Sequence, residues 1–430
     1  MSCVFAVGYF HGIVRANFVS TYTTFLFDFA VLGMYLSLLL RPPPATQGSG
    51  KSKIVPWITA LILWPLIVSA VPQNDILVQF VAFRATAWFL PMLWVGSRVT
   101  LADLRVVALT LALLNLVALA FGVAEYHYGV QAFYPLNAVT QIIYNSSDVA
   151  GGHLRIPSTF LNSHSYGGTM VCTLPFILGL LLKKRVSDLE KALLFAGLVA
   201  AAGGILLCAS RQPVVVAALL LFIAWAITGF SPRIAVGLAV ALVVLGVTTS
   251  GNERLLRFTN LTETSHVAMR IRGSVNESFL EYLASYPFGA GMGSSVGTSI
   301  PYFLASKAPK LVGLENEYCR ILIDQGWIGL LLWLAFIFWL HRRPPTRRDE
   351  AFVVLAYGLT LTTWATAFIG TGLLASIPGS AMLLMLMGIV AARRDEAPYT
   401  PPQSVQPLSS KSPRTSHSPD RQIARSLNTR

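Results

Sequence analysis

Long apolar runs, each of about the length that a helix needs to cross a bilayer, recur along the whole chain. A membrane-crossing helix needs roughly 20 mostly apolar residues, and about twelve segments of this chain fit that template. The pattern predicts an all-α, polytopic integral membrane protein with about twelve transmembrane helices. The candidate spans are residues 3–20, 22–40, 54–72, 76–96, 103–124, 165–182, 190–208, 213–229, 233–250, 319–340, 351–369 and 372–391.

The composition argues against a soluble protein. Of the 430 residues 54% are hydrophobic and only 12% are charged, about half of the roughly 25% that a soluble domain carries. At that charge density the chain cannot cover itself with a polar surface. A soluble enzyme, a nucleic-acid-binding protein and a secreted disulfide scaffold are therefore poor interpretations. The four cysteines are scattered and form no CxxC pair, so they predict neither a disulfide framework nor a metal site.

Lysine and arginine lie in short clusters between the apolar runs. There are 32 Lys and Arg residues against 19 Asp and Glu, which gives a net charge of +13. Clusters at the ends of spans follow the positive-inside rule, so the charge is a topology signal and does not call for a nucleic-acid partner. With a cytoplasmic N-terminus, strict alternation puts every strong cluster on the cytoplasmic side. These clusters are Lys183-Lys184-Arg185, Arg342-Arg343 with Arg347-Arg348, and Arg393-Arg394.

Two long segments then fall outside, at about residues 125–164 and 251–318. The other connections are short, so we expect function to reside in these two loops. Residues 1–392 are predicted to form the membrane domain. The tail 393–430 contains six prolines, seven serines and seven basic residues, which predicts a disordered, basic cytoplasmic extension.

Two arginines occupy positions where an isolated charge is costly. Arg84 lies within the fourth span and must face protein or water. Arg211 follows Ser210 in a tight outer turn between the seventh and eighth spans, where it needs a partner unless it reaches the lipid headgroups.

The first long loop ends with Arg155-Ile-Pro-Ser-Thr-Phe-Leu-Asn-Ser-His164. Asn162 and His164 either hydrogen-bond a sugar or cap the helix that follows. One histidine without further ligands is a weak basis for a metal site.

The second long loop contains an amphipathic run over residues 272–286, which predicts a periplasmic helix that ends at Pro287. The glycine-rich residues 287–293 that follow are either a plain turn or a phosphate-cradling loop. Glu315 and Asn316 then precede a span with glycines at 326 and 329, a pair that permits close helix packing. Glu315 at the helix start serves either as a first-turn carboxylate that favours the helix dipole or as a catalytic group.

Four of these segments, in this order along the chain, resemble the bacterial O-antigen ligase and polymerase superfamily over about residues 20–392. They are residues 155–164, 210–213, 272–293 and 314–329. Members of the superfamily share an Arg-x-x-(Gly/Ser)-Thr-Phe-x-(Asn/His) segment before a membrane helix, matched here by residues 155–162. They have an arginine just after a serine between two helices, matched by Ser210-Arg211. An arginine about fifteen residues before a glycine-rich turn is matched by Arg272, and an Asn-x9-Gly-x-x-Gly helix start by Asn316.

The resemblance implies a membrane glycosyltransferase with the all-helical architecture of lipid-carrier enzymes. Ligases of the superfamily have a histidine where this chain has Glu315, and an acidic residue there resembles the polymerases. The expected function is therefore polymerisation of undecaprenyl-diphosphate-linked repeat units into O-antigen or exopolysaccharide, at the periplasmic face of the inner membrane. A ligase that transfers glycan to lipid A-core remains an alternative, and a lipid-linked glycan transporter or flippase is the rival from another class.

The resemblance also implies roles for individual residues. Arg211 and Arg272 would stabilise the diphosphate leaving group, and Glu315 would act as the base. The substrate-binding candidates are Arg270, Arg155, Asn162, His164 and Asn316. Direct attack by the acceptor opposite the diphosphate would invert the anomeric centre, so we expect an inverting reaction. No Asp-x-Asp pair occurs in the sequence, so we expect neither a metal nor another cofactor. The expected partners are the lipid-linked donor, a glycan acceptor, the bilayer and other polysaccharide-assembly proteins, with no nucleic acid.

The charge distribution predicts that both termini are cytoplasmic and that residues 251–318 are periplasmic. Topology reporters fused after residue 290 and after residue 345 should therefore report opposite sides of the membrane. Matching signals from the two fusions would refute this topology.

Overall fold

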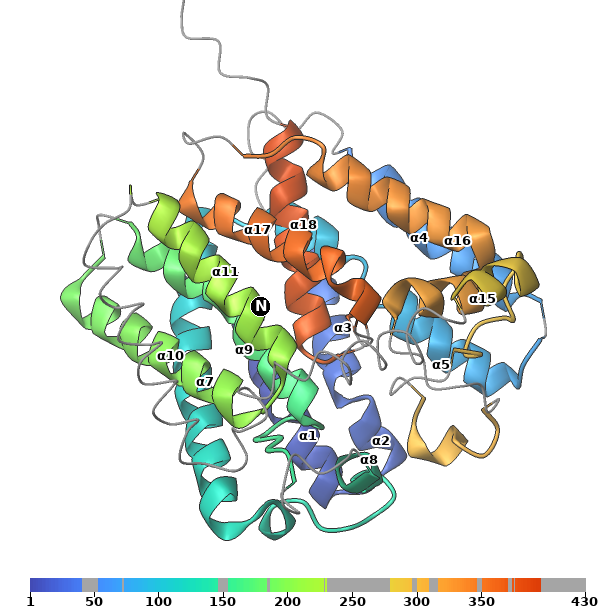
Figure 1. Cartoon of the computed structure of the whole chain (residues 1–430), viewed down its shortest axis with the longest axis horizontal. Helices are drawn as coiled ribbons and strands as arrows, with labels where there is room; N and C mark the ends of the chain where they lie inside the picture. Colours follow the sequence, from blue (N-terminus) through green and yellow to red (C-terminus); the bar gives the residue numbers. More distant parts are fainter. Residues whose placement is uncertain are drawn as a thin grey trace, which may run out of the picture. The chain divides into compact units, whose positions relative to one another are not determined.

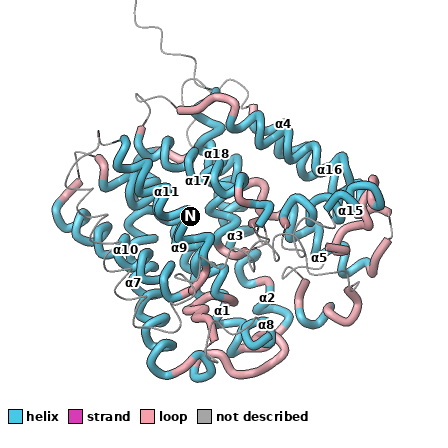
Figure 2. The backbone as a smooth tube through the Cα atoms, viewed as in Figure 1, coloured by secondary structure: helices cyan, strands magenta, loops and turns pink. Residues whose placement is uncertain are grey.

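The computed structural model describes residues 1–40, 53–71, 73–145, 154–183, 186–227, 229, 279–295, 300–308, 316–345, 350–369, 373–374 and 376–395. Met1–Asp395 forms one compact unit. The regular structure of the described residues is helical, with no strand (Figures 1 and 2), which confirms the predicted all-α class. The predicted tail lies outside the described residues from residue 396 onward.

The described elements follow the predicted spans closely. Their bounds are α1 Ser2–Asn17, α2 Thr21–Thr24, α3 Leu26–Leu40, α4 Ile54–Ser69, α5 Ile76–Ala87, α6 Met92–Ser97, α7 Leu101–Tyr128, η1 Val130–Ala132, α8 Gln141–Asn145, α9 Ser163–Leu181, α10 Asp188–Leu207, α11 Arg211–Ile227, α15 Phe279–Ser285, η4 Tyr302–Leu304, α16 Glu317–His341, α17 Ala351–Ala365, η5 Ala367–Ile369 and α18 Gly379–Asp395. Of the helix predicted at 272–286, the described part is α15.

Five helical stretches are long and apolar enough to cross a membrane: Ile76–Ser97, Ala102–Tyr128, Ser163–Leu181, Asp188–Leu207 and Glu317–His341. Shorter apolar helices lie at Leu26–Leu40, Ile54–Ser69, Arg211–Ile227, Ala351–Ala365 and Gly379–Ala392. A polytopic membrane protein is therefore supported, while the count of twelve spans stays a prediction. The candidate span 233–250 lies outside the described residues.

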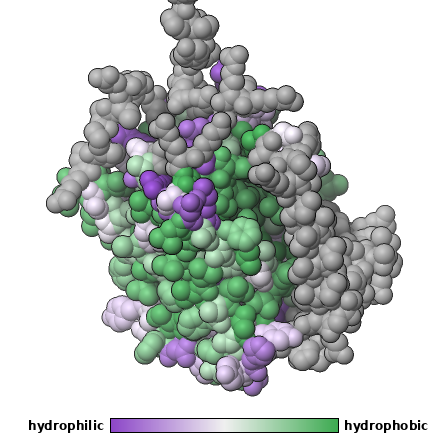
Figure 3. All heavy atoms as spheres, turned by 90° about the vertical axis from the view of Figure 1, so that its left-hand side faces the viewer, coloured by the Kyte–Doolittle hydropathy of each residue, from purple (hydrophilic) through white to green (hydrophobic). Residues whose placement is uncertain are grey.

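The side of the molecule formed by α7, α10 and α11 is broadly hydrophobic. Figure 3 shows a green band on that side, with hydrophilic residues gathered above and below it. Leu113, Phe195 and Phe222 contribute large exposed side chains there, each more than half exposed. In water such a surface would be an aggregation hazard, whereas in lipid it is the expected exterior.

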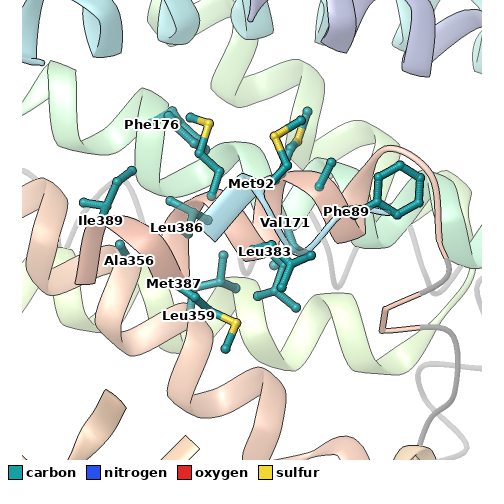
Figure 4. Close-up of a cluster of buried hydrophobic side chains, with 14 of the residues drawn as sticks. Phe89, Met92, Val171, Phe176, Ala356, Leu359, Leu383, Leu386, Met387 and Ile389 are labelled. Atoms are coloured by element: carbon teal, nitrogen blue, oxygen red, sulfur yellow. The ribbon is translucent and has the colours of Figure 1, made fainter. Parts of the chain in front are cut away.

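The centre of the unit is built on close contact between α6 and α18. A Cβ atom added to Gly96 would lie 2.0 Å from the carbonyl oxygen of Met385, and one added to Gly388 would lie 2.1 Å from that of Leu93. The two glycines thus let the backbones touch, which is how helices commonly associate in membranes. Figure 4 shows buried side chains of α9 and α17, including Phe176 and Leu359, packed around this pair.

Arg84 has the protein partner that the sequence analysis required. Its Nε donates to Oδ1 of Asp28 on α3 at 2.6 Å, and its Nη2 donates to Oδ2. The guanidinium also lies 5.1 Å from the ring centre of Phe25. The pair joins α3 to α5, and only 13% of the Arg84 side chain and 8% of the Asp28 side chain are exposed.

Removal of this carboxylate should destabilise the fold strongly. Asp28→Ala leaves the buried guanidinium without its counter-charge, at a cost of about 3–5 kcal/mol. Asp28→Leu combined with Arg84→Leu should recover most of the loss, because an apolar pair carries no desolvation penalty. Arg105→Ala is the matched control, since it breaks an exposed pair with Glu190 and should cost no more than about 1 kcal/mol. Thermal unfolding in one detergent or nanodisc tests this order, and equal losses for Asp28→Ala and Arg105→Ala would contradict it.

Candidate functional site

The segment from Arg155 to Asn162 crosses the C-terminal half of α1 at very short range. The amide N–H of Ile13 lies 3.0 Å from the carbonyl oxygen of Thr159. A Cβ atom on Gly12 would lie 2.1 Å from the carbonyl carbon of Phe160. Glycine at position 12 therefore lets the segment lie directly on the α1 backbone, and the segment then turns into α9.

Arg155 and His164 are in direct contact. Nη1 of Arg155 lies 2.8 Å from Nε2 of His164. A guanidinium group can only donate hydrogen bonds, so Nε2 accepts and the proton of the neutral imidazole lies on Nδ1. Nδ1 faces the hydroxyl of Ser210 at 3.5 Å. The histidine thus lies between two motifs that are far apart in the sequence.

Arg211 begins α11 immediately after this contact. The turn before it contains Ala209, whose φ of 49° places it in the left-handed region. The turn also packs tightly on α9, because a Cβ atom on Gly167 would lie 2.5 Å from Sγ of Cys208. The tight turn predicted between these two helices is confirmed, and it brings the Arg211 backbone next to the His164 contact.

The connection between α17 and α18 touches both α9 and α11. Gln212 Nε2 donates to Thr366 Oγ1 at 3.2 Å, and Ser376 Oγ donates to Ser165 Oγ at 2.8 Å. The same connection reaches α16, because the ring centroid of Phe368 lies 4.6 Å from that of Tyr318. The starts of α9, α11 and α16 are therefore linked through one short region.

Asn162 and Asn316 are both helix caps. The Asn162 side chain accepts from the N–H of Ser165 at 2.8 Å, so of its two predicted roles the structure provides the capping one. Asn316 is fully buried, and its Oδ1 accepts from the N–H groups of Tyr318 and Cys319 at 2.9 and 3.2 Å. Sugar binding by either residue stays a prediction.

The start of α16 corrects one expectation. The helix begins at Glu317 behind the Asn316 cap, so the first-turn carboxylate is Glu317 and Glu315 precedes the cap. Glu315, Arg270 and Arg272 lie outside the described residues, and their roles stay predictions.

The glycine-rich residues 287–293 pack against a break in α16. Gly326 has a φ of 68°, and a Cβ atom there would lie 2.5 Å from the carbonyl carbon of Phe288. The N–H of Ala290 donates to the carbonyl oxygen of Ile323 at 2.7 Å, and that of Trp327 donates to Pro287 at 2.9 Å. These contacts support the turn rather than a phosphate cradle. They also show that Gly326 accommodates a loop where helix packing was expected.

A buried charged network on α16 was not predicted. Arg320 donates to Glu317 at 2.5 and 2.8 Å and lies 3.6 Å from Asp324. Asp324 accepts from both the N–H and the hydroxyl of Ser295, at 2.9 and 2.7 Å. The spacing of three and four residues within an apolar helix was the available signal. The network attaches the segment around Ser295 to α16.

An ion pair also holds the segment between α15 and α16. Lys307 Nζ lies 3.1 Å from Oδ2 of Asp75, the residue that caps α5. The hydrogen bond from Lys307 keeps the pKa of the Asp75 carboxyl below its usual value. In the described part of the chain, no group of three or more His, Cys, Asp or Glu side chains could hold a metal ion.

Residues 196–334 match a protein-family model described as O-Antigen ligase. The match begins in α10, includes the Ser210-Arg211 turn, and continues beyond the Gly326 break of α16. No curated protein matches the chain. Together with the apolar helices, the family match indicates a membrane protein that processes glycans. The match supports the resemblance drawn from the motifs, since residues 196–334 are similar to the O-antigen ligase-like superfamily.

Proposed function

We propose that the chain is an inverting, metal-independent glycosyltransferase that polymerises undecaprenyl-diphosphate-linked repeat units at the periplasmic face of the inner membrane. The observation that carries this proposal is the contact of Arg155 with His164, and of His164 with Ser210, directly before Arg211. Two motifs of the superfamily that are separated by about fifty residues in sequence meet here at helix ends.

The arginines suit a diphosphate leaving group. A guanidinium is always charged and binds phosphate oxygens through two parallel hydrogen bonds. Arg211 opens α11 at the end of two apolar helices, a position that supports a role at the headgroup level, where a lipid-linked diphosphate lies. We assign Arg211 and Arg272 to the negative charge that grows on the diphosphate as the glycosidic bond breaks.

The acceptor hydroxyl needs a base, and we assign that role to Glu315. The hydroxyl oxygen attacks the anomeric carbon from the side opposite the diphosphate, and its proton passes to the Glu315 carboxylate. The bond between the anomeric carbon and the diphosphate oxygen breaks, and the electron pair leaves with undecaprenyl diphosphate. One displacement of this kind inverts the anomeric configuration. The Asn316 cap supports the assignment because it anchors the residue next to Glu315 on α16.

A polymerase is favoured over a ligase by the carboxylate at position 315, where ligases of the superfamily have histidine. The description of the matching family model keeps the ligase as the alternative. Purified protein supplied with lipid-linked repeat units, with and without a lipid A-core acceptor, separates the two. Long chains on the carrier identify a polymerase, and transfer to the core identifies a ligase.

A transporter of lipid-linked glycans is less consistent with the described charges. Transport through the bilayer calls for polar groups along a continuous path. Two of the charged pairs buried in the described part are engaged internally, Arg84 with Asp28 and Arg320 with Glu317. The polar groups of the family motifs gather at helix starts, which supports an enzyme.

Arg211→Ala should abolish polymer formation while membrane insertion and yield stay normal. One lost transition-state contact costs about 3–4 kcal/mol, or roughly a hundredfold or more in rate. Arg211→Lys should restore only part of the activity because the two-pronged donor is lost. Arg98→Ala is the matched control. Arg98 follows the Ile76–Ser97 stretch, stacks on Trp94 and belongs to none of the family motifs. Chain-length ladders of the reconstituted variants provide the measurement, and near-normal turnover by Arg211→Ala would remove Arg211 from the site.

Glu315→Gln should bind the lipid-linked donor and fail to transfer it. Glutamine keeps the size of the side chain but cannot take a proton, so the rate should fall roughly 10²–10⁴-fold. Glu281→Gln removes an exposed carboxylate of α15 and is the control. Donor binding and single-turnover transfer are measured separately, with Glu315→His as the ligase-like companion. Normal polymerisation by Glu315→Gln would show that the base lies elsewhere.

A further inference from the structure

Backbone strain in the described part of the chain coincides with the proposed site. Its two non-glycine residues with positive φ are Ser158, at 54°, and Ala209, at 49°. Ser158 follows Arg155 by three residues, and Ala209 precedes Arg211 by two. Such conformations persist only where the surroundings hold them, and they gather at functional sites. The Ser158 turn therefore needs an identifiable support.

That support comes from three buried hydrogen bonds. The N–H of Ser158 donates to Oε2 of Glu125 at 2.8 Å, and its hydroxyl donates to the carbonyl oxygen of Ala118 at 2.6 Å. Its own carbonyl oxygen accepts from the Tyr134 hydroxyl at 2.5 Å. Ser158, Glu125 and Tyr134 are each 0% exposed, so water does not compete for these bonds.

Tyr134 reaches beyond Ser158 and keeps its proton. The phenol oxygen lies 2.7 Å from the carbonyl oxygen of Phe160 as well, so it spans both sides of the turn. Burial holds the pKa of Tyr134 well above its usual value, which keeps the phenol a donor at any working pH. Gly12 of α1 closes the remaining side through its contact with the Phe160 backbone.

Glu125 is an unusual residue for its place on α7. It lies near the C-terminal end of a long apolar helix, and its Oε1 is buried without a hydrogen-bond partner among the described residues. A buried carboxyl in such a helix is costly, and among the described residues its hydrogen-bond partner is the Ser158 backbone N–H. The free-energy cost of burying this carboxyl is explained if its bond to the Ser158 N–H holds the site in place.

We propose that Glu125 and Tyr134 are positioning residues that hold the strained Ser158 turn and thereby fix Arg155 against His164 and the Ser210-Arg211 turn. The inference rests on the proposed function, because it takes Arg155 to contact the anionic part of the donor. Glu125 and Tyr134 act through the backbone and do not touch the substrate.

Two substitutions at Glu125 separate its hydrogen bond from its size. Glu125→Leu removes the acceptor for the Ser158 N–H, whereas Glu125→Gln retains an oxygen that can accept. We expect Glu125→Leu to raise the donor KM by roughly five- to tenfold or more, as for loss of a buried partner. Glu125→Gln should restore most of the affinity. Tyr134→Phe, which removes one hydroxyl, should raise KM in the same direction.

A double-mutant cycle tests whether Glu125 acts through Arg155. If it does, Glu125→Leu combined with Arg155→Ala should be no worse in donor KM than Arg155→Ala alone. Asn115→Leu is the control, since Asn115 is a buried residue of α7 that bonds Tyr9 and Thr173. This variant should lower thermal stability without changing the donor KM.

Hydrogen exchange gives a readout that does not depend on turnover. Peptides that contain Ser158 should exchange faster in Glu125→Leu and Tyr134→Phe than in the wild type, Glu125→Gln or Asn115→Leu. Additive effects in the cycle, or an unchanged KM in both Glu125→Leu and Tyr134→Phe, would overturn the proposal. If Glu125→Leu does not fold, the proposal is tested by Tyr134→Phe and by the double-mutant cycle of Tyr134→Phe with Arg155→Ala. If Arg155→Ala itself leaves the donor KM unchanged, the assignment of Arg155 as a substrate-binding residue fails. Unchanged hydrogen exchange would instead refute the support of the turn by Glu125 and Tyr134.

Discussion

Inside the hydrocarbon layer a polar group is tolerated only when its partner lies beside it, and the arrangement of the described helices depends on that constraint. Apolar faces do not select one another in lipid, because lipid tails are as apolar as leucine. Which helices pack together is decided instead by buried polar groups, because each of them needs a hydrogen-bonding or charged partner on a neighbouring segment. Asp28 on α3 requires α5 with Arg84, and Asp324 on α16 requires Ser295 of the glycine-rich segment before it. Each match joins segments that are distant in the chain.

Close backbone contact at glycines is the second interaction that decides which segments pack together. Gly96 and Gly388 bring α6 and α18 together at the centre of the unit, and Gly326 admits the loop around Phe288 into α16. The polar matches and the glycine contacts act on different elements. Together they gather the starts of α9, α11 and α16 around the connection between α17 and α18, where the motifs of the superfamily lie.

Much of the fold could be predicted because its signals are local. Apolar runs of sufficient length mark membrane helices, and an arginine such as Arg84 within one of them demands a partner. The partner itself could not be predicted, since Asp28 lies on a helix that only the packing brings near. The left-handed backbone at Gly326 was missed for the same reason. It depends on a loop nearly forty residues earlier in the chain, and Gly-x-x-Gly in sequence suggests helix packing.

The candidate site was predictable as a set of motifs but not as a geometry. From the sequence, Asn162 was expected either to bind a sugar or to cap the following helix, and in the structure it caps α9. His164 was treated as a lone histidine, although it lies between Arg155 and Ser210. Glu125 was placed at the start of an outer loop, because the end of an apolar run is a weak boundary. Only the fold shows that α7 continues to Tyr128 and carries this carboxyl into the interior.

The break at Gly326 also determines how α16 meets the bilayer. The regular helix beyond it, residues 327–341, is roughly 22 Å long at 1.5 Å per residue, shorter than a hydrocarbon layer of about 30 Å. The half of α16 before the break must therefore make up the hydrophobic thickness, although it carries Glu317, Arg320 and Asp324. These three side chains are buried and partly neutralise one another, so this half can lie at lipid depth. A thicker bilayer would draw more of the charged half into the hydrocarbon layer, and hydrophobic mismatch would then act on this end of the helix.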